Sequence, residues 1–196
     1  MKRAVFFVLN EYADWEGGYL SSQLNRNPEW LVKTASIKPE VTSIGGFTTK
    51  IDYQVDDIPS DIDLLVLIGG DTWRIENVSL LELIQTRLNS SKPVAAICGS
   101  VDYLARNGLL DGYKHTGNSQ YLWRKYINYH NDNDYMNEQA VIDNNLVTAN
   151  GTAVLEFTNL VLKMIEFNSD DQVNKMTDLY KVGLYNYCHQ YGSPFH

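Results

Sequence analysis

The sequence predicts an α/β fold in which helices cover both faces of a mostly parallel sheet. Short apolar runs rich in β-branched residues alternate along the chain with helix-length amphipathic segments, which is the pattern of such a fold. One of these runs, residues 63–68, is almost entirely apolar, as expected of a central strand that is buried on both faces. The length of 196 residues suits one large domain, so we expect residues 1–196 to form a single domain.

The first half of the chain contains most of the predicted strands. In chain order, the expected elements are a strand at 3–9, a helix at 15–25, strands at 30–37 and 41–51, the central strand at 63–68, a helix at 79–89 and a strand at 93–98. Asp14 is the expected N-cap of the first helix, because a short acidic side chain can accept a hydrogen bond from the first turn. Gly45 and Gly46 predict a tight turn that interrupts the run at 41–51.

The second half is more helical and contains an irregular stretch. In chain order, we expect a helix at 100–107, a polar and aromatic segment at 112–138 with a short helix near 119–125, a hairpin at 140–148, and helices at 153–166 and about 170–187. The irregular segment either walls a pocket or forms a surface loop. Asn144 and Asn145 are the expected turn of the hairpin, since Asn tolerates a positive φ. The last helix packs on the body of the protein or on a partner.

Composition and charge argue against several classes of function. A formal net charge of -8 disfavours a surface that binds nucleic acid, because such binding depends on clustered Lys and Arg. No run approaches the roughly 20 apolar residues of a membrane span, and the basic start of the chain lacks a cleavage site, so we expect a soluble protein with no membrane partner. Cys98 and Cys188 lie far apart, without the spacing of metal ligands. We therefore expect a cytoplasmic protein without disulfides, metal or other cofactor.

Cys98 is a candidate nucleophile, because an apolar strand gives way to a predicted helix at this point of the chain. A sharp strand-to-helix turn exposes a side chain above the sheet and places the positive end of a helix beneath it. In that position we expect a thiolate with a lowered pKa. The alternative is a small apolar residue that ends a buried strand, since free cysteine is among the most buried residue types.

Three loops that follow predicted strands, at 10–16, 69–71 and 98–100, converge on one pocket if the strands are neighbours. In open α/β sheets, ligands bind beyond the carboxyl ends of the strands. Backbone N–H groups in turns of small residues suit a developing oxyanion, and we expect Gly70, Asp71 and Gly99 to supply them. The alternative for the glycines at 69 and 70 is an ordinary tight turn.

Glu16 and His115 are the candidate proton carriers. A carboxyl group packed between Trp15 and a pocket has a raised pKa, stays protonated and can hydrogen-bond a thiolate. The more common role of Glu16 is that of a solvated partner of the helix dipole. His115 follows the helix after Cys98 and acts as the base if the chain returns it to the pocket, whereas its alternative is a surface or half-buried histidine. His189 and His196, near the end of the chain, are poor candidates.

Taken together, these segments resemble the ThiJ/PfpI superfamily, the cysteine-containing branch of the class I glutamine-amidotransferase-like fold. The resemblance covers roughly residues 3–166 and rests on ordered segments: Glu16 after the first strand, 68–70, 96–100, 104–112 and 149–157. It implies a flavodoxin-like three-layer sandwich, usually a homodimer, with a nucleophile elbow. It also implies that Cys98 is the reactive thiol, that Glu16 is its hydrogen-bond partner, and that the Gly70 and Gly99 amides lie near the oxyanion.

Gly99 departs from the family pattern, because protease-like members carry a histidine directly after the cysteine. Residues 149–151 likewise lack the His and Glu pair of glutamine amidotransferases, which argues against ammonia transfer. The leading hypothesis is a cysteine-dependent hydrolase, a protease or amidase that acts on a carbonyl or amide of a small-molecule or peptide substrate through Cys98. The alternatives are an oxidation sensor or stress-protective dimer, a small-aldehyde or isonitrile hydratase, and a binding module walled by the aromatic residues at 121–129.

Overall fold

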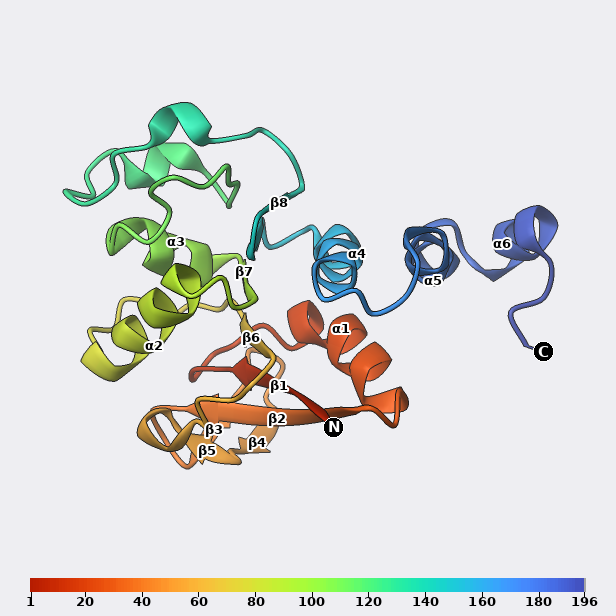
Figure 1. The fold of residues 1–196 in the computed structure, drawn as a ribbon, viewed down its shortest axis with the longest axis horizontal. Coiled ribbons are helices and arrows are strands. Elements are labelled where there is room, and N and C mark those ends of the chain that lie inside the picture. Colours follow the sequence, from red (N-terminus) through yellow and green to blue (C-terminus); the bar gives the residue numbers. More distant parts are fainter. Residues whose placement is uncertain (196) are drawn as a thin grey trace.

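A seven-stranded sheet forms the centre of this computed structural model, which describes residues 1–195 (Figure 1). The strand order is β5-β2-β1-β6-β7-β9-β8, and every neighbouring pair is parallel except β8 and β9. The strands are β1 Lys2–Phe7, β2 Trp30–Ser36, β5 Tyr53–Gln54, β6 Leu64–Leu67, β7 Val94–Ile97, β8 Ala140–Asp143 and β9 Leu146–Ala149. The predicted α/β class is confirmed. His196 lies outside the described residues.

Helices cover both faces of the sheet, as Figure 1 shows for α2 and α3 on one side and α1 and α4 on the other. The helices are α1 Asp14–Arg26, α2 Val78–Asn89, α3 Gly99–Arg106, α4 Val154–Met164, α5 Asp170–Val182 and α6 Leu184–Tyr191. Successive residues of β6 point to opposite faces, so Leu65 packs with the α2 and α3 side while Leu64 packs with the α1 and α4 side. Both faces of β6 are buried, which explains its uniformly apolar sequence.

The predicted run at 41–51 forms a separate hairpin, β3 Glu40–Thr42 and β4 Thr48–Lys50, beside the main sheet. Gly46 takes a φ of 85° in its turn. The expectation that Asp14 caps α1 is wrong: Ala13 is the N-cap, with no side-chain hydrogen bond to the helix. Asp14 is the first helical residue, and its Oδ2 accepts the Gly45 N–H at 2.7 Å. The carboxylate thus holds the hairpin against α1.

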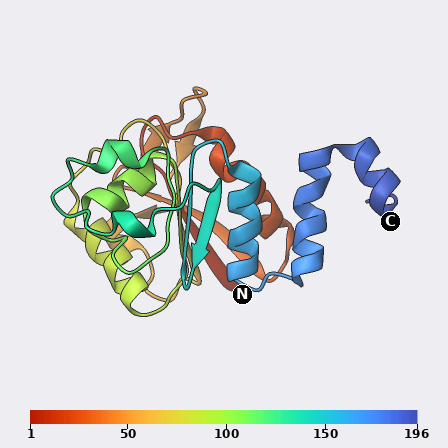
Figure 2. The ribbon, with the colours of Figure 1, turned by 90° about the horizontal axis from the view of Figure 1, so that it is seen from above.

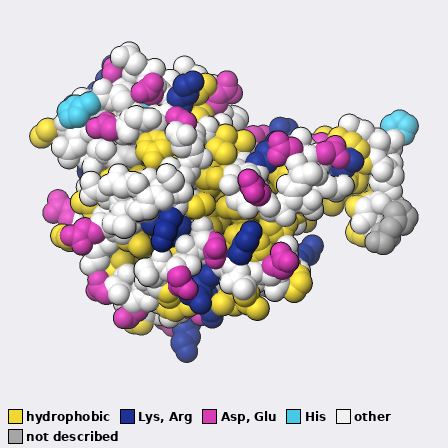
Figure 3. Space-filling view, viewed as in Figure 1, with side chains coloured by type: hydrophobic (Ala, Val, Ile, Leu, Met, Phe, Trp, Pro, Cys, Tyr) yellow, Lys and Arg dark blue, Asp and Glu magenta, His cyan; other side chains and the backbone are white. Residues whose placement is uncertain are grey.

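The irregular segment contains two short 3₁₀ helices, Gln120–Trp123 and Asp132–Asp134, and the first confirms the short helix expected near 119–125. Another 3₁₀ turn, Val55–Asp57, follows β5. The hairpin of β8 and β9 is also confirmed, with Asn144 at a φ of 50° in its turn. Acidic and basic side chains are interspersed over the face of the molecule in Figure 3.

The predicted C-terminal helix at about 170–187 is instead two helices. Gly183, with a φ of 81°, separates α5 from α6. Val173 of α5 is fully buried against the body, whereas no residue of α6 is buried. Figure 2 shows both helices beyond α4, with α6 farther from the sheet. In residues 1–195, no helix has both the length and the apolar character needed to cross a bilayer.

Candidate active site

The carboxyl ends of β1, β6 and β7 meet at one edge of the sheet, because β6 pairs with both other strands. The loops that follow β1 and β6 are joined by an antiparallel bridge between Tyr12 and Gly70. In this bridge the Ala13 N–H donates to the Gly69 carbonyl at 3.0 Å. The expected convergence of the three loops is confirmed.

Cys98 occupies a strained turn between β7 and α3. Its φ of 61° and ψ of -127° lie outside the regions that a non-glycine residue ordinarily adopts, at a cost of roughly 1–3 kcal/mol. Two backbone hydrogen bonds hold it there: the Cys98 N–H donates to the Ala149 carbonyl, and its own carbonyl accepts the Val101 N–H, each at 3.0 Å. The thiol is half-buried.

Ser100 fixes the same turn from within the core, where its side chain has no exposed surface. Its Oγ accepts the Ile97 N–H at 2.9 Å and lies 2.8 Å from the carbonyl oxygens of Leu67 and Ile97, to which it can donate. One hydroxyl therefore ties the end of β7 to the end of β6. The elbow is a rigid part of the sheet edge.

Glu16 projects from the first turn of α1 toward the thiol and is only 1% exposed. Its Oε2 accepts the Gly69 N–H at 2.8 Å, and the carboxyl group also hydrogen-bonds with the Cys98 side chain. Burial raises the pKa of Glu16 to about 7, against the opposing effect of these hydrogen bonds. A Cβ added to Gly69 would lie 2.5 Å from both Glu16 Oε2 and Cys98 Cβ, so only glycine allows this approach.

The Cys98 thiol has a raised pKa, which contradicts the lowered value expected from its place at a helix N-terminus. Burial is the largest cause and the negative charge of Glu16 is the next, and together they raise the pKa of Cys98 to about 11. Hydrogen bonds from Asn118 and from the Gly99 N–H act in the opposite direction. Burial therefore has the largest effect on the ionisation of this thiol, and the carboxyl group of Glu16 is the nearby charge that adds to it.

Two residues that the sequence reasoning did not assign complete the surroundings of the sulfur. Asn118 Nδ2 donates to Cys98 Sγ at 3.3 Å, and Asn118 Oδ1 accepts the Gly151 N–H at 2.9 Å. A Cβ on Gly151 would lie 2.9 Å from the same sulfur. Asn118 lies three positions after the candidate base His115. Gly151 lies in the segment 149–157, which is one of the segments that resemble the family.

His115 is not brought into hydrogen-bonding contact with Cys98. Its side chain is fully buried, with Nδ1 2.8 Å from the Tyr113 carbonyl oxygen and Nε2 2.8 Å from the Tyr129 hydroxyl. The ring also packs against Trp123 and Tyr135, and burial lowers the pKa of His115. With both ring nitrogens engaged elsewhere, His115 serves the packing of this segment in the structure.

The three expected oxyanion donors differ in their surroundings. The Asp71 N–H is already used, since it donates to the Glu11 carbonyl at 3.2 Å in the bridge between the loops. The N–H of Asp71 that was expected to serve an oxyanion therefore already has a backbone acceptor. The Gly99 N–H hydrogen-bonds with the Cys98 sulfur, and within residues 1–195 the Gly70 N–H has no hydrogen-bond acceptor. Gly70 and Gly99 lie in contact, because a Cβ on Gly99 would approach the Gly70 carbonyl oxygen to 2.5 Å.

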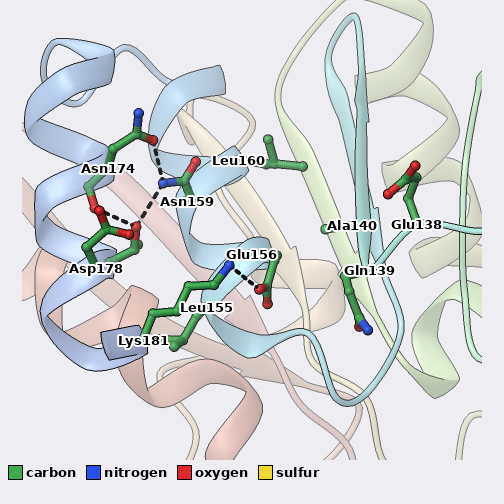
Figure 4. A pocket seen from close by; sticks show the side chains of 11 residues that line it. Glu138, Gln139, Ala140, Leu155, Glu156, Asn159, Leu160, Asn174, Asp178 and Lys181 are labelled. Carbon is green, nitrogen blue, oxygen red and sulfur yellow. Dashed lines mark hydrogen bonds and ion pairs between the residues drawn. The ribbon is translucent and has the colours of Figure 1, made fainter. Parts of the chain in front are cut away.

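A separate cleft of about 440 Å³ lies between the start of β8, α4 and α5 (Figure 4). The ion pair between Lys181 Nζ and Glu156 Oε1, at 3.0 Å, crosses one side of it. Gln139 at its rim also reaches the loop that carries Gly151, because Gln139 Oε1 accepts from Asn150 Nδ2 at 2.9 Å. None of the predicted site residues lines this cleft.

Comparison with known sequences and structures identifies the family. A sequence model of the DJ-1/PfpI family matches residues 2–164. The chain belongs to the DJ-1/PfpI family. It is 50% identical over 195 residues to "Uncharacterized protease YdeA" of Bacillus subtilis (strain 168), covering 100% of this chain and 99% of that protein. It is 33% identical over 192 residues to "Uncharacterized protease YoaZ" of the same organism, covering 92% and 91% of the two chains.

Among solved structures, the thiJ/pfpI family protein from Bacillus anthracis superposes with a TM-score of 0.89 at 36% sequence identity. The match covers 96% of this chain and 94% of that chain. The flavodoxin-like α/β fold expected from the sequence is therefore the fold of the family. The relatives' names call them proteases.

Proposed function

We propose that this DJ-1/PfpI family protein is a cysteine-dependent hydrolase in which Cys98 attacks the carbonyl carbon of an amide or related substrate. The observation that carries the proposal is the hydrogen-bonded pair of Cys98, at a strained elbow, and Glu16, a buried carboxyl group with a pKa raised to about 7. A carboxyl group with this pKa can both take and return a proton near neutral pH. The protease names of the two relatives agree with the proposal.

In the proposed first step, the ionised Glu16 takes the proton of the Cys98 thiol. Once the carboxyl group is neutral, its charge no longer opposes the thiolate, and the hydrogen bond that it donates to sulfur favours the anion. The thiolate forms a bond to the substrate carbonyl carbon, and the carbonyl π electrons move to oxygen. The N–H groups of Gly70 and Gly99 are the proposed donors to this oxyanion.

In the remaining steps, the oxyanion collapses, the C–N bond breaks and Glu16 returns its proton to the leaving amine. A thioester on Cys98 remains. Water then attacks the thioester carbonyl while Glu16 accepts a proton from the water, and the thiolate leaves. Reprotonation of sulfur by Glu16 restores the starting state, so that one amide and one water give one acid and one amine. Glu16 carries every proton in this scheme.

Replacement of the nucleophile tests the proposal. With a panel of aminoacyl p-nitroanilides, Cys98→Ser is expected to lower turnover at least 1000-fold, roughly the scale seen when a nucleophile is removed. Cys188→Ser is the matched control, because Cys188 lies on α6, and it should retain the parent rate. Intact mass measurement after mixing should detect an acyl group on the parent protein and none on the Cys98→Ser variant.

Two results would overturn the proposal that this protein is a hydrolase. One is turnover by Cys98→Ser at the rate of the parent. The other is no turnover of any amide in the panel together with preferential peroxide oxidation of Cys98 over Cys188, which would favour the oxidation sensor. The homodimer implied by the family remains part of the proposal, and sedimentation equilibrium of the purified protein measures it directly.

A further inference from the structure

The side chain of Asn118 contacts the sulfur that the proposed function makes the nucleophile. It closes a short chain of hydrogen bonds, from the Gly151 N–H to Asn118 Oδ1 at 2.9 Å and from Asn118 Nδ2 to Cys98 Sγ at 3.3 Å. Because a backbone N–H can only donate, the oxygen of the amide must face Gly151 and its NH₂ group must face the sulfur. The orientation of the amide is therefore set by the main chain.

The loop that carries Asn118 is anchored at the two residues that precede it, Thr116 and Gly117. The Thr116 N–H donates to Thr148 Oγ1 at 2.9 Å, and Thr116 Oγ1 donates to the Glu138 carbonyl at 2.8 Å. At the next position, a Cβ on Gly117 would lie 2.6 Å from the Trp123 ring, so the backbone rests directly on that ring. These contacts place Asn118 before any substrate arrives.

The loop that carries Gly151 is fixed in a similar way. Asn150 Oδ1 accepts both the Thr152 N–H at 3.0 Å and the Thr152 hydroxyl at 2.7 Å, and the Asn150 N–H donates to the Gln139 carbonyl at 3.1 Å. The donor that orients Asn118 is thus held on a turn with its own hydrogen bonds. A donor fixed in this way suits stabilisation of a charge that appears during the reaction, because no reorganisation is needed.

We propose that Asn118 is a catalytic residue that stabilises the Cys98 thiolate by donating from its side-chain NH₂ group. This proposal rests on the proposed function, in which that thiolate is the nucleophile. An amide NH₂ group donates a hydrogen bond but does not accept a proton. Asn118 can therefore stabilise the thiolate without acting as a general base. Proton transfer is then left to Glu16, which is the charged side chain that acts on the thiol.

Alkylation of Cys98 by iodoacetamide as a function of pH tests the proposal, with mass spectrometry to separate Cys98 from Cys188. The alkylation rate reports the thiolate whether or not the protein turns over any substrate, so its result is independent of the hydrolase assay. Asn118→Ala should slow Cys98 alkylation about tenfold at neutral pH and shift its pH profile to higher pH, since a hydrogen bond to a charged group is lost.

Asn118→Asp tests the hydrogen bond to sulfur more specifically than Asn118→Ala. Its Oδ1 still accepts the Gly151 N–H, so the loop keeps its anchor, but a carboxylate oxygen replaces the NH₂ group that faces the sulfur. Alkylation should fall more than tenfold above pH 6, because the new negative charge opposes the thiolate. Asn137→Ala, at an exposed position in the same irregular segment, is the matched control and should alkylate at the parent rate.

The outcomes separate the two proposals. If the pH profiles of Asn118→Ala and Asn118→Asp coincide with that of the parent, or if Asn137→Ala shows the same loss, the catalytic role of Asn118 is overturned. If both Asn118 variants shift the alkylation profile while no amide is hydrolysed by the parent, the role of Asn118 at the thiolate stands and the hydrolase fails. Circular dichroism melting of each variant confirms that the protein measured is folded.

Discussion

The buried carboxyl group of Glu16 makes the stability of this protein depend on pH in a defined direction. Unfolding exposes the group to water, where its pKa returns to the ordinary value of 4.5, while in the folded protein burial holds the pKa at about 7. Between these two values the unfolded state loses its proton first, so rising pH favours unfolding. The contribution is fully present below 4.5 and is lost as pH rises through 7.

The rise in pKa from 4.5 to about 7 corresponds to roughly 3 kcal/mol of folding free energy. Glu16→Gln abolishes this titration and keeps an oxygen that accepts the Gly69 N–H. The free energy of unfolding of Glu16→Gln, relative to the parent, should therefore increase by about 3 kcal/mol between pH 4.5 and pH 8. The thiol of Cys98 contributes little in this range, because its ordinary pKa of 9.0 and its pKa of about 11 in the folded protein both lie above pH 8.

Urea unfolding followed by tryptophan fluorescence, repeated at half-unit steps from pH 4.5 to pH 8.5, measures this difference. Glu82→Gln, which removes an exposed carboxyl group of α2, is the matched control, and its difference from the parent should vary little with pH. If the free energy of unfolding of Glu16→Gln relative to the parent stays constant from pH 4.5 to pH 8.5, the pKa of Glu16 is not raised. The role of Glu16 in the proposed mechanism would then be refuted as well.

Two further changes probe the elbow. Ser100→Ala removes the hydroxyl that accepts the buried Ile97 N–H, and it should lower the free energy of unfolding by about 1–3 kcal/mol in the same urea assay; an unchanged midpoint would show that the hydroxyl does not hold the turn. Gly151→Ala places a methyl group against Cys98 Sγ and should slow iodoacetamide alkylation of that thiol about tenfold or more. Gly18→Ala is its control, because a Cβ there meets nothing within 4 Å, and it should leave alkylation unchanged while stabilising α1 by about 0.5–1 kcal/mol. Equal alkylation rates for the two alanine variants would count against a glycine requirement at the sulfur.

The elements of the site that follow strands could be predicted from the sequence. Parallel strands end at a common edge, so an apolar run that gives way to small residues indicates a position at that edge without any knowledge of side-chain contacts. Glu16, Gly70 and Cys98 come together for this reason. In the sheet, β1, β6 and β7 are consecutive neighbours, as the convergence of their loops requires.

The residues contributed by irregular segments could not be predicted in the same way. Periodicity carries no information between 112 and 138, and chemical preference favoured His115, whereas the chain delivers Asn118, three positions later, to the sulfur. His115 is instead buried among aromatic side chains from later in the same irregular segment, Trp123, Tyr129 and Tyr135. Gly183 illustrates the same limit on a smaller scale, because a single glycine in a helical pattern does not reveal that its φ is positive.

Three glycines, at positions 69, 99 and 151, lie at or next to Cys98, and a Cβ added to any of them would come within 3.0 Å of a neighbouring atom. Because these positions have no room for a side chain, substitutions there cannot be used to favour one substrate over another. Differences in substrate preference at this site are expected to arise from the other side chains of the surrounding loops, such as those of 112–138 apart from Asn118, which contacts the sulfur. A library built to redirect this protein would therefore keep the glycines and Asn118 fixed and diversify the rest of that segment.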